Sequence, residues 1–314
     1  MQPVAELDRP AAGGRGDPIC PLCGGTASWP LAHMSDAGTD EQIAARHGAA
    51  AYAWRLCRTC GNGYPTCQPD LAILATLWQR NRALDDNDQT DADSIWRYRQ
   101  EISRKGARRS YALFAPLRAG APGRFLDIAC GLGETVRTFA DHGWDALGID
   151  ADPSVRRFHQ ALGIRSEIGQ VETLRPDGRF DIIQIAHAIY FVTEPRRFLE
   201  SLRDLLSEDG HLCIVLADFM AADDLSLPNY HHSFFPTATS MRYLLALAGF
   251  RTRLCRSRSG SCYIAAQVGA GPLPQVHPWL IRFGYRSRRL RYALFGRPKL
   301  ALHRWAKRVL SAIR

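Results

Sequence analysis

The chain has 314 residues, of which 46% are hydrophobic and 23% charged, and its formal net charge is +9. These values predict a globular protein with a sizeable core. No apolar run approaches the roughly 18 residues of a membrane span, and the first residues include acids and no apolar stretch, which excludes a secretory signal peptide. The positive charge is local, because residues 271–314 contain eleven Lys or Arg and no acid. The rest of the chain, with 29 bases against 31 acids, is nearly neutral.

Two Cys-x-x-Cys pairs lie near the N-terminus, and each has a Gly directly after its second Cys. Two thiols at this spacing can face one ion, and the Gly lets backbone N–H groups point at the thiolates. The pairs therefore predict a structural Zn²⁺ site in a zinc-ribbon-like domain of a protein from a reducing cytoplasm, with room for a hairpin between the pairs. Cys67, His33 and His47 are spare ligand candidates. The four predicted ligands are Cys20, Cys23, Cys57 and Cys60.

Residues 124–152 predict a strand, a glycine turn, a helix and a second strand. An apolar run that ends in Cys130 is typical of a buried parallel strand. Gly131 and Gly133 follow at once, and the second strand ends on Asp150. Glycines before a helix let the backbone approach a ligand. An acid at the tip of the second strand can hold the two hydroxyls of a ribose.

Three details separate this turn from other nucleotide-binding turns. The third Gly of a dinucleotide fold is replaced by Val136, and the Gly-Lys-Ser/Thr of a phosphate-binding loop is missing. Asp127 lies inside the first strand, where a buried acid suits a cationic ligand better than a pyrophosphate. The run D-x-A-C-G-x-G with a downstream acid resembles the first two motifs of class I S-adenosylmethionine (SAM) methyltransferases.

The resemblance implies an α/β fold with a doubly wound, mostly parallel seven-stranded sheet of the Rossmann-like type. It also implies that a helix before the first strand closes over the cofactor, and that a short loop reads the adenine. Residues 95–115 read as that helix, and 250–256 and 261–268 read as the antiparallel pair that closes the sheet. The residues that the resemblance assigns to SAM are Asp127, Ala129, Gly131, Gly133, Asp150, Ala151, Val171, Glu172 and His187.

The residue that would act as catalytic base is left open by the sequence. SAM donates its methyl group by direct in-line displacement, so the protein supplies alignment and a deprotonated acceptor. His187 follows the fourth strand, and His231 and His232 lie in a loop after the fifth; imidazole has a pKa suited to this task. Tyr190 and Tyr230 are alternatives, or aromatic walls of an acceptor pocket. The Glu-His pair that many relatives carry after the fourth strand is absent.

The ribbon region is similar in layout to that of deoxysugar C-methyltransferases, and the residues that fit are Cys57, Cys60, Gly61, Tyr64 and Pro69. This layout and the near-neutral core favour a small-molecule acceptor: a sugar, a glycan or a natural-product intermediate. The zinc site and the basic tail instead favour an RNA or other nucleic-acid methyltransferase, but the Asn/Asp-Pro-Pro-Tyr/Phe motif of base methylation is missing. A catalytically degenerate SAM-binding protein is the third alternative.

Residues 298–314 can form a basic amphipathic helix that contains a Trp, which predicts an interfacial membrane helix. The alternatives for its apolar face are packing on the domain or on a second subunit of a homodimer. Its basic residues could also follow nucleic acid. We therefore expect a cytoplasmic protein that is peripheral at the inner membrane face if this helix binds lipid. The predicted organisation is a disordered leader (1–17), the ribbon-like domain (18–80), an acidic linker (81–94), the SAM-dependent domain (95–269) and the basic tail (270–314).

Overall fold

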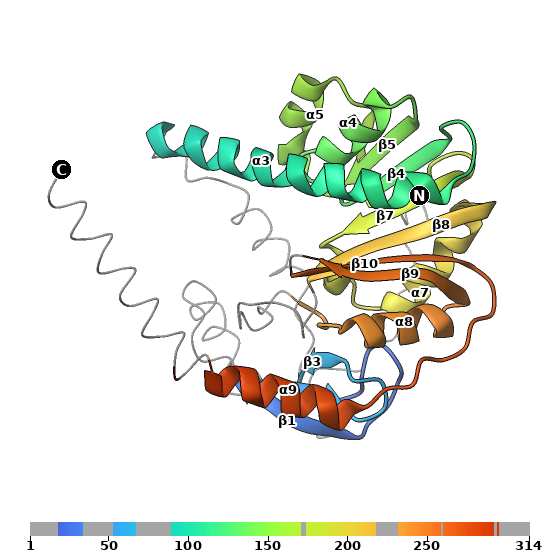
Figure 1. Cartoon of the computed structure of the whole chain (residues 1–314). Coiled ribbons are helices and arrows are strands. Elements are labelled where there is room, and N and C mark those ends of the chain that lie inside the picture. The colour runs from blue at the N-terminus through green and yellow to red at the C-terminus, as the bar shows by residue number, and fades with distance from the viewer. Residues whose placement is uncertain are drawn as a thin grey trace, which may run out of the picture.

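The computed structural model describes residues 18–33, 53–66, 89–170, 174–217, 232–258, 260–291 and 294. They form a three-stranded and a seven-stranded sheet, with helices on both faces of the larger sheet (Figure 1). None of the helices in these ranges is long and apolar enough to cross a membrane. The predictions that lie outside the described residues concern the leader, Pro69, Val171, Glu172, Tyr230, His231, the spare ligands His47 and Cys67, and the helix over 298–314.

The larger sheet has the strand order β6-β5-β4-β7-β8-β10-β9. Strands β6, β5, β4, β7 and β8 are parallel, and β10 is antiparallel to both of its neighbours. This confirms the predicted doubly wound, mostly parallel sheet. The order reverses between β4 and β7, and ligands of such sheets bind at the carboxyl edge beside that reversal. The strands are β4 (Arg124–Ile128), β5 (Asp145–Asp150), β6 (Ser166–Ile168), β7 (Phe180–Ala186), β8 (Leu206–Ala217), β9 (Phe250–Arg258) and β10 (Ser261–Val268).

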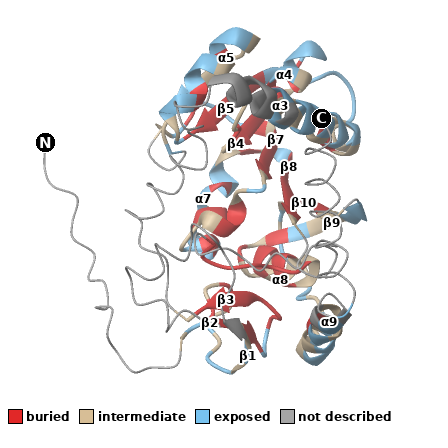
Figure 2. Ribbon diagram, turned by 90° about the vertical axis from the view of Figure 1, so that its left-hand side faces the viewer, coloured by how far each residue is buried: buried red, intermediate tan, exposed pale blue. Residues whose placement is uncertain are grey.

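The central strands are apolar on both faces, as expected for a parallel sheet covered by helices. Phe125 and Ile182 belong to a core shared with helices α3 and α4, while Leu126 and Ile183 belong to a core shared with α7 and α8. Buried residues are accordingly concentrated in the strands and in the inner sides of the helices (Figure 2). The helices are α3 (Gln89–Phe114), α4 (Glu134–Asp141), α5 (Arg156–Leu162), α7 (Pro195–Ser201), α8 (Ala238–Leu247) and α9 (Pro278–Arg291), with 3-10 turns η2 (Ala115–Leu117), η3 (Pro153–Val155), η4 (Ile189–Phe191) and η5 (Arg203–Leu205).

Helix α3 is longer than the sequence predicted and begins at Gln89, within the stretch expected to be an acidic linker. It packs along α4, the helix that follows the glycine turn. The Tyr111 ring meets Phe139 edge-on at 5.1 Å, and Arg104 forms an ion pair with the buried Glu134 at 3.1 Å. Glu134 is the first residue of α4, where a negative charge also favours the helix dipole. Helix α3 thus fixes the start of α4 relative to the sheet.

The small sheet consists of β1 (Ser28–His33), β2 (Ala53–Cys57) and β3 (Gly63–Pro65). Strands β1 and β2 pair antiparallel, which confirms a hairpin between the two cysteine pairs. The small sheet is joined to the larger domain, because Gly63 and Phe235 exchange two backbone hydrogen bonds, of 2.7 and 3.1 Å. Cys57 and Met241 of α8 belong to the same continuous apolar core. The ribbon is therefore attached to the face of the sheet that α7 and α8 cover.

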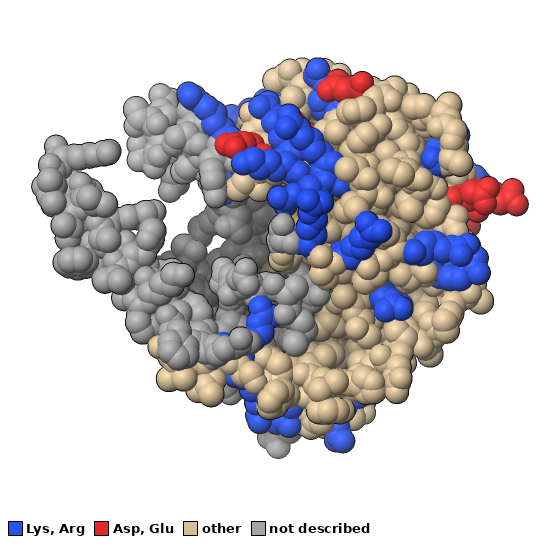
Figure 3. All heavy atoms as spheres, viewed as in Figure 1, with Lys and Arg blue, Asp and Glu red and all other residues tan. Residues whose placement is uncertain are grey.

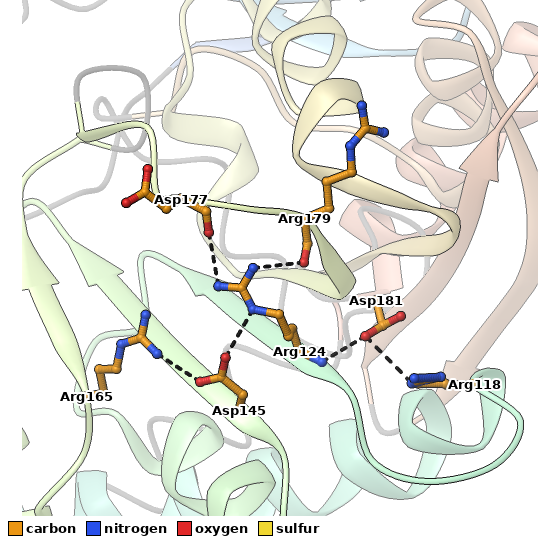
Figure 4. A network of polar contacts seen from close by, with 7 residues as sticks. All are labelled: Arg118, Arg124, Asp145, Arg165, Asp177, Arg179 and Asp181. Carbon is orange, nitrogen blue, oxygen red and sulfur yellow. Dashed lines mark hydrogen bonds and ion pairs between the residues drawn. The ribbon is translucent and has the colours of Figure 1, made fainter.

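A polar network ties together the amino ends of three neighbouring strands (Figure 4). The backbone N–H of Arg124, at the start of β4, donates to Asp181 of β7 at 2.8 Å, and its guanidinium contacts Asp145 of β5 at 3.0 Å. Arg165 reaches the same Asp145 carboxylate at 2.8 Å, and Arg118 lies 3.6 Å from Asp181. These groups lie at the end of the sheet opposite the glycine turn, so we assign them a structural role.

Candidate active site and cysteine cluster

The two glycines of the turn after β4 have different tasks. Gly131 and Gly133 both have positive φ, of 56° and 81°, which favours glycine. A Cβ at Gly131 would meet no atom within 4 Å, whereas one at Gly133 would clash with Ile164 and crowd His159 at 3.1 Å. Gly133 is thus required by packing, while the backbone at Gly131 borders open space that a ligand can occupy.

The third glycine that dinucleotide-binding helices carry is absent here, and a glycine on the neighbouring strand provides the space instead. Val136 of α4 occupies the place of the missing third Gly, and it faces Gly148 of β5. A Cβ at Gly148 would lie 2.9 Å from the Val136 side chain and 2.8 Å from the Cys130 sulfur. Close approach of helix and strand is therefore preserved, because the small residue now lies on the strand.

Asp150 at the end of β5 holds two loops by its carboxylate. One oxygen accepts the backbone N–H of Gly131 at 2.7 Å, and the other accepts that of Asp152 at 3.0 Å. Asp150 is buried, and a carboxylate bonded to backbone N–H groups is held in one orientation. The structure therefore brings together Gly131 and Asp150, two of the residues predicted to bind SAM. Ala151, a third, directly follows Asp150 in the chain.

Asp127 lies in the middle of this edge and is only 2% exposed. Its carboxylate accepts a hydrogen bond from the Gln184 amide of β7 at 3.2 Å. Burial is the main reason that the pKa of Asp127 is raised to about 7, and the Asp150 charge raises it further, against the hydrogen bonds from Gln184 and Thr135. A positive charge that binds beside such a carboxyl group stabilises its ionised form. Among the described residues, the buried Gln184 carbonyl oxygen has no hydrogen-bond partner.

Two residues other than glycine adopt the left-handed conformation at the same edge. Ala129 follows β4 with φ 58°, and His187 follows the adjacent β7 with φ 54°. The His187 N–H donates to the Val215 carbonyl of β8 at 2.7 Å, which holds the turn in place. Backbone strain of this kind gathers at functional sites. The imidazole of His187 is accessible to solvent, yet desolvation by the surrounding protein lowers its pKa, so the ring is neutral near pH 7 and able to accept a proton.

An aromatic cluster follows His187 and includes two further candidate residues. The Tyr190 ring lies 4.5 Å from His232 and 6.1 Å from Phe235, measured between ring centroids. Tyr190 and the segment of His232 are joined by a hydrogen bond of 2.8 Å from the Ser233 N–H to the Tyr190 carbonyl. Burial raises the pKa of Tyr190 above its ordinary value. Its phenol therefore stays protonated and suits a wall of the site better than a base.

Sequence reasoning missed two residues that hold the glycine turn and its acid. His159 of α5 is buried, and its Nε2 lies 2.8 Å from the Gly131 carbonyl oxygen and 3.7 Å from the Cys130 sulfur. No local signal marks a His at this position in a helix. Gln184 carried a signal, because it is a polar residue among the isoleucines of a buried strand.

The four cysteines predicted to bind zinc lie together in the ribbon. All four sulfurs lie within 4.8 Å of one another, with 3.6 Å between Cys20 and Cys60 and 3.5 Å between Cys23 and Cys57. A tetrahedral Zn²⁺ site with bonds of about 2.3 Å has sulfurs about 3.8 Å apart, so the arrangement fits this ion. The Thr59 N–H points at the Cys57 sulfur at 3.4 Å, as in the predicted knuckle. Hydrogen bonding from Cys20 lowers the pKa of Cys57, which favours a thiolate at this ligand of the cluster.

A seven-stranded sheet of this order, with a glycine turn after its first parallel strand and an acid at the tip of the next, defines the class I SAM-dependent methyltransferases. Residues 95–254 match a family described as a methyltransferase domain, and the chain belongs to this family. It is a SAM-dependent methyltransferase with a four-cysteine module before the catalytic domain.

Among individual proteins, the chain is 30% identical over 115 residues to the uncharacterized methyltransferase YcgJ of Bacillus subtilis (strain 168). That match covers 34% of this chain and 45% of the relative, so the chain spans under half of the relative's length. Among solved structures, the glycopeptide N-methyltransferase MtfA with SAM matches at 17% identity and a TM-score of 0.44, over 53% of this chain and 94% of MtfA. The mitomycin 7-O-methyltransferase MmcR matches at 17% and 0.47, over 58% and 59% of the two chains.

Proposed function

We propose that the enzyme transfers the methyl group of SAM to a small-molecule acceptor at the carboxyl edge of β4, β5 and β7. The observation that carries the proposal is the convergence of Asp127, the open backbone at Gly131 and Asp150 at this edge. Asp150 holds the ribose, and Asp127 faces the positive part of the cofactor. SAM supplies an electrophilic methyl group on a sulfonium. Ala129, Gly133 and Ala151 shape the backbone around it, and Val171, Glu172 and His187 complete the predicted contacts.

His187 is our candidate for the base, and the aromatic cluster after it is the candidate wall of the acceptor pocket. A neutral imidazole that solvent can reach is able to take the proton of an acceptor hydroxyl. His232 is buried among Tyr190 and Phe235, which favours a role in the wall, and His231 stays a second candidate base. Aromatic walls suit the apolar faces of sugars and of natural-product intermediates.

Replacing His187 by Ala tests this assignment. We expect turnover to fall by about 100- to 10,000-fold, the usual contribution of a general base. SAM affinity should fall by no more than about 1 kcal/mol, the size of one lost cofactor contact. The matched control is His142→Ala, which removes an exposed histidine of the surface after α4. Steady-state kinetics with an acceptor that the enzyme methylates measure turnover, and calorimetry measures SAM binding separately. Equal turnover of the two variants would assign the proton transfer to another group.

The acceptor class is tested with SAM that carries a labelled methyl group. Cell extract is divided into small-molecule, glycan and RNA fractions, and each fraction is incubated with the full chain. We expect label in the small-molecule or glycan fraction. Label in RNA alone would replace our proposal by the nucleic-acid alternative. SAM binding without transfer to any fraction would instead indicate a degenerate SAM-binding protein.

One surface favours the nucleic-acid alternative. Lys and Arg side chains gather over α3 on one face of the molecule (Figure 3). Polyanions bind to surfaces of this kind with an affinity that falls as salt rises. The exposed arginines of α3 include Arg97, Arg99, Arg108 and Arg109.

The pKa of Asp127 predicts how SAM binding depends on pH. The carboxyl group is largely protonated below about pH 7, and a cationic ligand favours its ionised form. SAM affinity should therefore rise with pH and level off above about pH 7, with up to about one proton released per SAM.

The folding stability of the protein without SAM should change with pH in the opposite direction. Because the folded pKa lies above the ordinary value of 3.8, the contribution of the neutral carboxyl is lost as pH rises through about 7.

Calorimetry in buffers of different ionisation enthalpy measures the released protons directly. Asp127→Asn keeps the size of the side chain and cannot titrate, so its SAM affinity should be lower above pH 7 and should lose the pH dependence. A pH profile shared by the variant and the original chain would show that another group titrates.

Structural Zn²⁺ in the cysteine cluster is part of the proposal. It is supported by the four sulfurs within 4.8 Å and by the burial of Cys20, Cys57 and Cys60 in the core shared with α8. The ion would hold the turn of Cys57 to Cys60 and, through it, Gly63 and Phe235. The zinc module would thus position one wall of the acceptor pocket.

A further inference from the structure

Helix α9 is a surface helix with one face fixed on the ribbon. Ile281 packs so closely over Gly61 that a Cβ there would clash with it. The Arg282 guanidinium lies 5.0 Å from the centre of the Trp29 ring, and Tyr285 is buried. Residues 281, 282 and 285 share one side of a helix. The orientation of α9 is therefore set by its contacts with the ribbon, and its opposite side faces away from the protein.

The outer side of α9 exposes large apolar side chains. Trp279 is 60% exposed, Phe283 68% and Leu290 60%. They follow one another at i, i+4 and i+11 and form a stripe, which Leu280 widens at its start. Contiguous apolar surface of this kind marks an interaction site on a monomer. In the burial view, α9 lies at the edge of the molecule with its outer side exposed (Figure 2).

The charged side chains of the C-terminal segment are all basic. Residues 271–314 contain eleven Lys or Arg and no acid, and five of the bases lie in α9. Arg286 is exposed between Phe283 and Leu290 on the outer side. Basic side chains are also visible at the position of α9 in the space-filling view (Figure 3). The partner of this surface must therefore accept both apolar side chains and positive charge.

We propose that α9 lies flat on an anionic membrane surface. Its outer stripe enters the boundary between headgroups and acyl chains, and its arginines meet anionic headgroups, as in interfacial amphipathic helices. A second copy of the chain fits less well, because a two-fold contact between identical helices would bring like charges together without an acid to neutralise them. Nucleic acid would accept the arginines and leave Trp279, Phe283 and Leu290 in water.

The experiment is co-sedimentation of the full chain with vesicles of phosphatidylcholine, with and without phosphatidylserine. We expect binding only to the vesicles with phosphatidylserine, and weaker binding at high salt. The double variant Trp279→Ser, Phe283→Ser should partition about 10- to 100-fold less, because two aromatic side chains no longer enter the lipid. Arg286→Glu should weaken binding to anionic vesicles and leave the apolar stripe intact.

The matched control is Ile102→Ser, which removes a 52% exposed apolar side chain from α3. It should bind vesicles as the original chain does. Failure of the original chain to bind anionic vesicles would overturn the proposal, and so would equal binding by the double variant, which would assign the contact to another segment. A dimer in lipid-free solution that the double variant dissociates would show that a second copy covers the stripe. Zinc content and SAM affinity, which these exposed positions should not change, verify the fold of each variant.

Discussion

Removal of the proposed Zn²⁺ is expected to lower methyl transfer by about 100-fold while SAM affinity changes by less than about 1 kcal/mol. A displacement of a positioning group by about 1 Å is enough for a rate effect of this size. The SAM-binding edge at Gly131 and Asp150 makes its own contacts in the sheet domain, and distant sites behave independently. Methyl transfer and SAM binding should thus respond differently to removal of the metal.

The physical reason is the connection from the cluster to the acceptor wall. Cys60 is followed within three residues by Gly63, which exchanges two backbone hydrogen bonds with Phe235. Phe235 lies 5.5 Å from the His232 ring, and His232 lies against Tyr190. Without the ion the four thiols are no longer held together, and the position of Phe235 is no longer fixed.

Cys57→Ser is the direct test, with Cys255→Ser as the matched control. Cys57 is fully buried in the cluster, whereas Cys255 is an exposed thiol of β9 outside it. Elemental analysis should show about one Zn²⁺ per chain in the original protein and in the control, and a loss in Cys57→Ser. Acceptor kinetics and calorimetry of SAM then give the two effects separately. Full activity of a protein without metal would contradict the prediction, and a parallel loss of SAM binding would show that the ribbon supports the whole domain.

Asp150→Ala is expected to weaken SAM binding by about 2–3 kcal/mol, or roughly 30- to 150-fold in affinity. The change removes an acceptor for the ribose hydroxyls. It also removes the carboxylate that holds the N–H groups of Gly131 and Asp152, at 2.7 and 3.0 Å. The glycine turn would then be less ordered before SAM binds, which adds an ordering cost to the lost contact.

Asp145→Ala is the control for this prediction. Asp145 begins the same strand, β5, at the opposite edge of the sheet, where it binds Arg124 and Arg165 (Figure 4). Its removal should change stability slightly, since surface ion pairs contribute at most about 1 kcal/mol, and should leave SAM affinity unchanged. Calorimetry of both variants, with melting temperatures as a measure of folding, distinguishes the two roles. Equal SAM affinities would remove Asp150 from the cofactor site.

Local patterns were sufficient for the strand–turn–helix unit of β4 and α4 and for the cysteine pairs. The position of Asp127 in the apolar strand, the positive φ required at Gly131 and the spacing of Cys57 and Cys60 are properties of short segments, so they can be read before the chain is folded. The doubly wound, mostly parallel seven-stranded sheet followed from the resemblance of these motifs to one family, and the structure has such a sheet.

Contacts between distant segments could not be predicted in this way. Gly148 replaces the missing third glycine because it faces Val136 from another strand, and His159 reaches the Gly131 carbonyl oxygen from the next helix. The sequence divided the chain into a ribbon-like domain and a SAM-dependent domain but indicated no contact between them. In the structure the two are joined at Gly63 and Phe235. Spacing along the chain determines which side chains share one turn or one strand, but the partner across a core depends on shapes and unpaired backbone groups that meet only when the chain has folded.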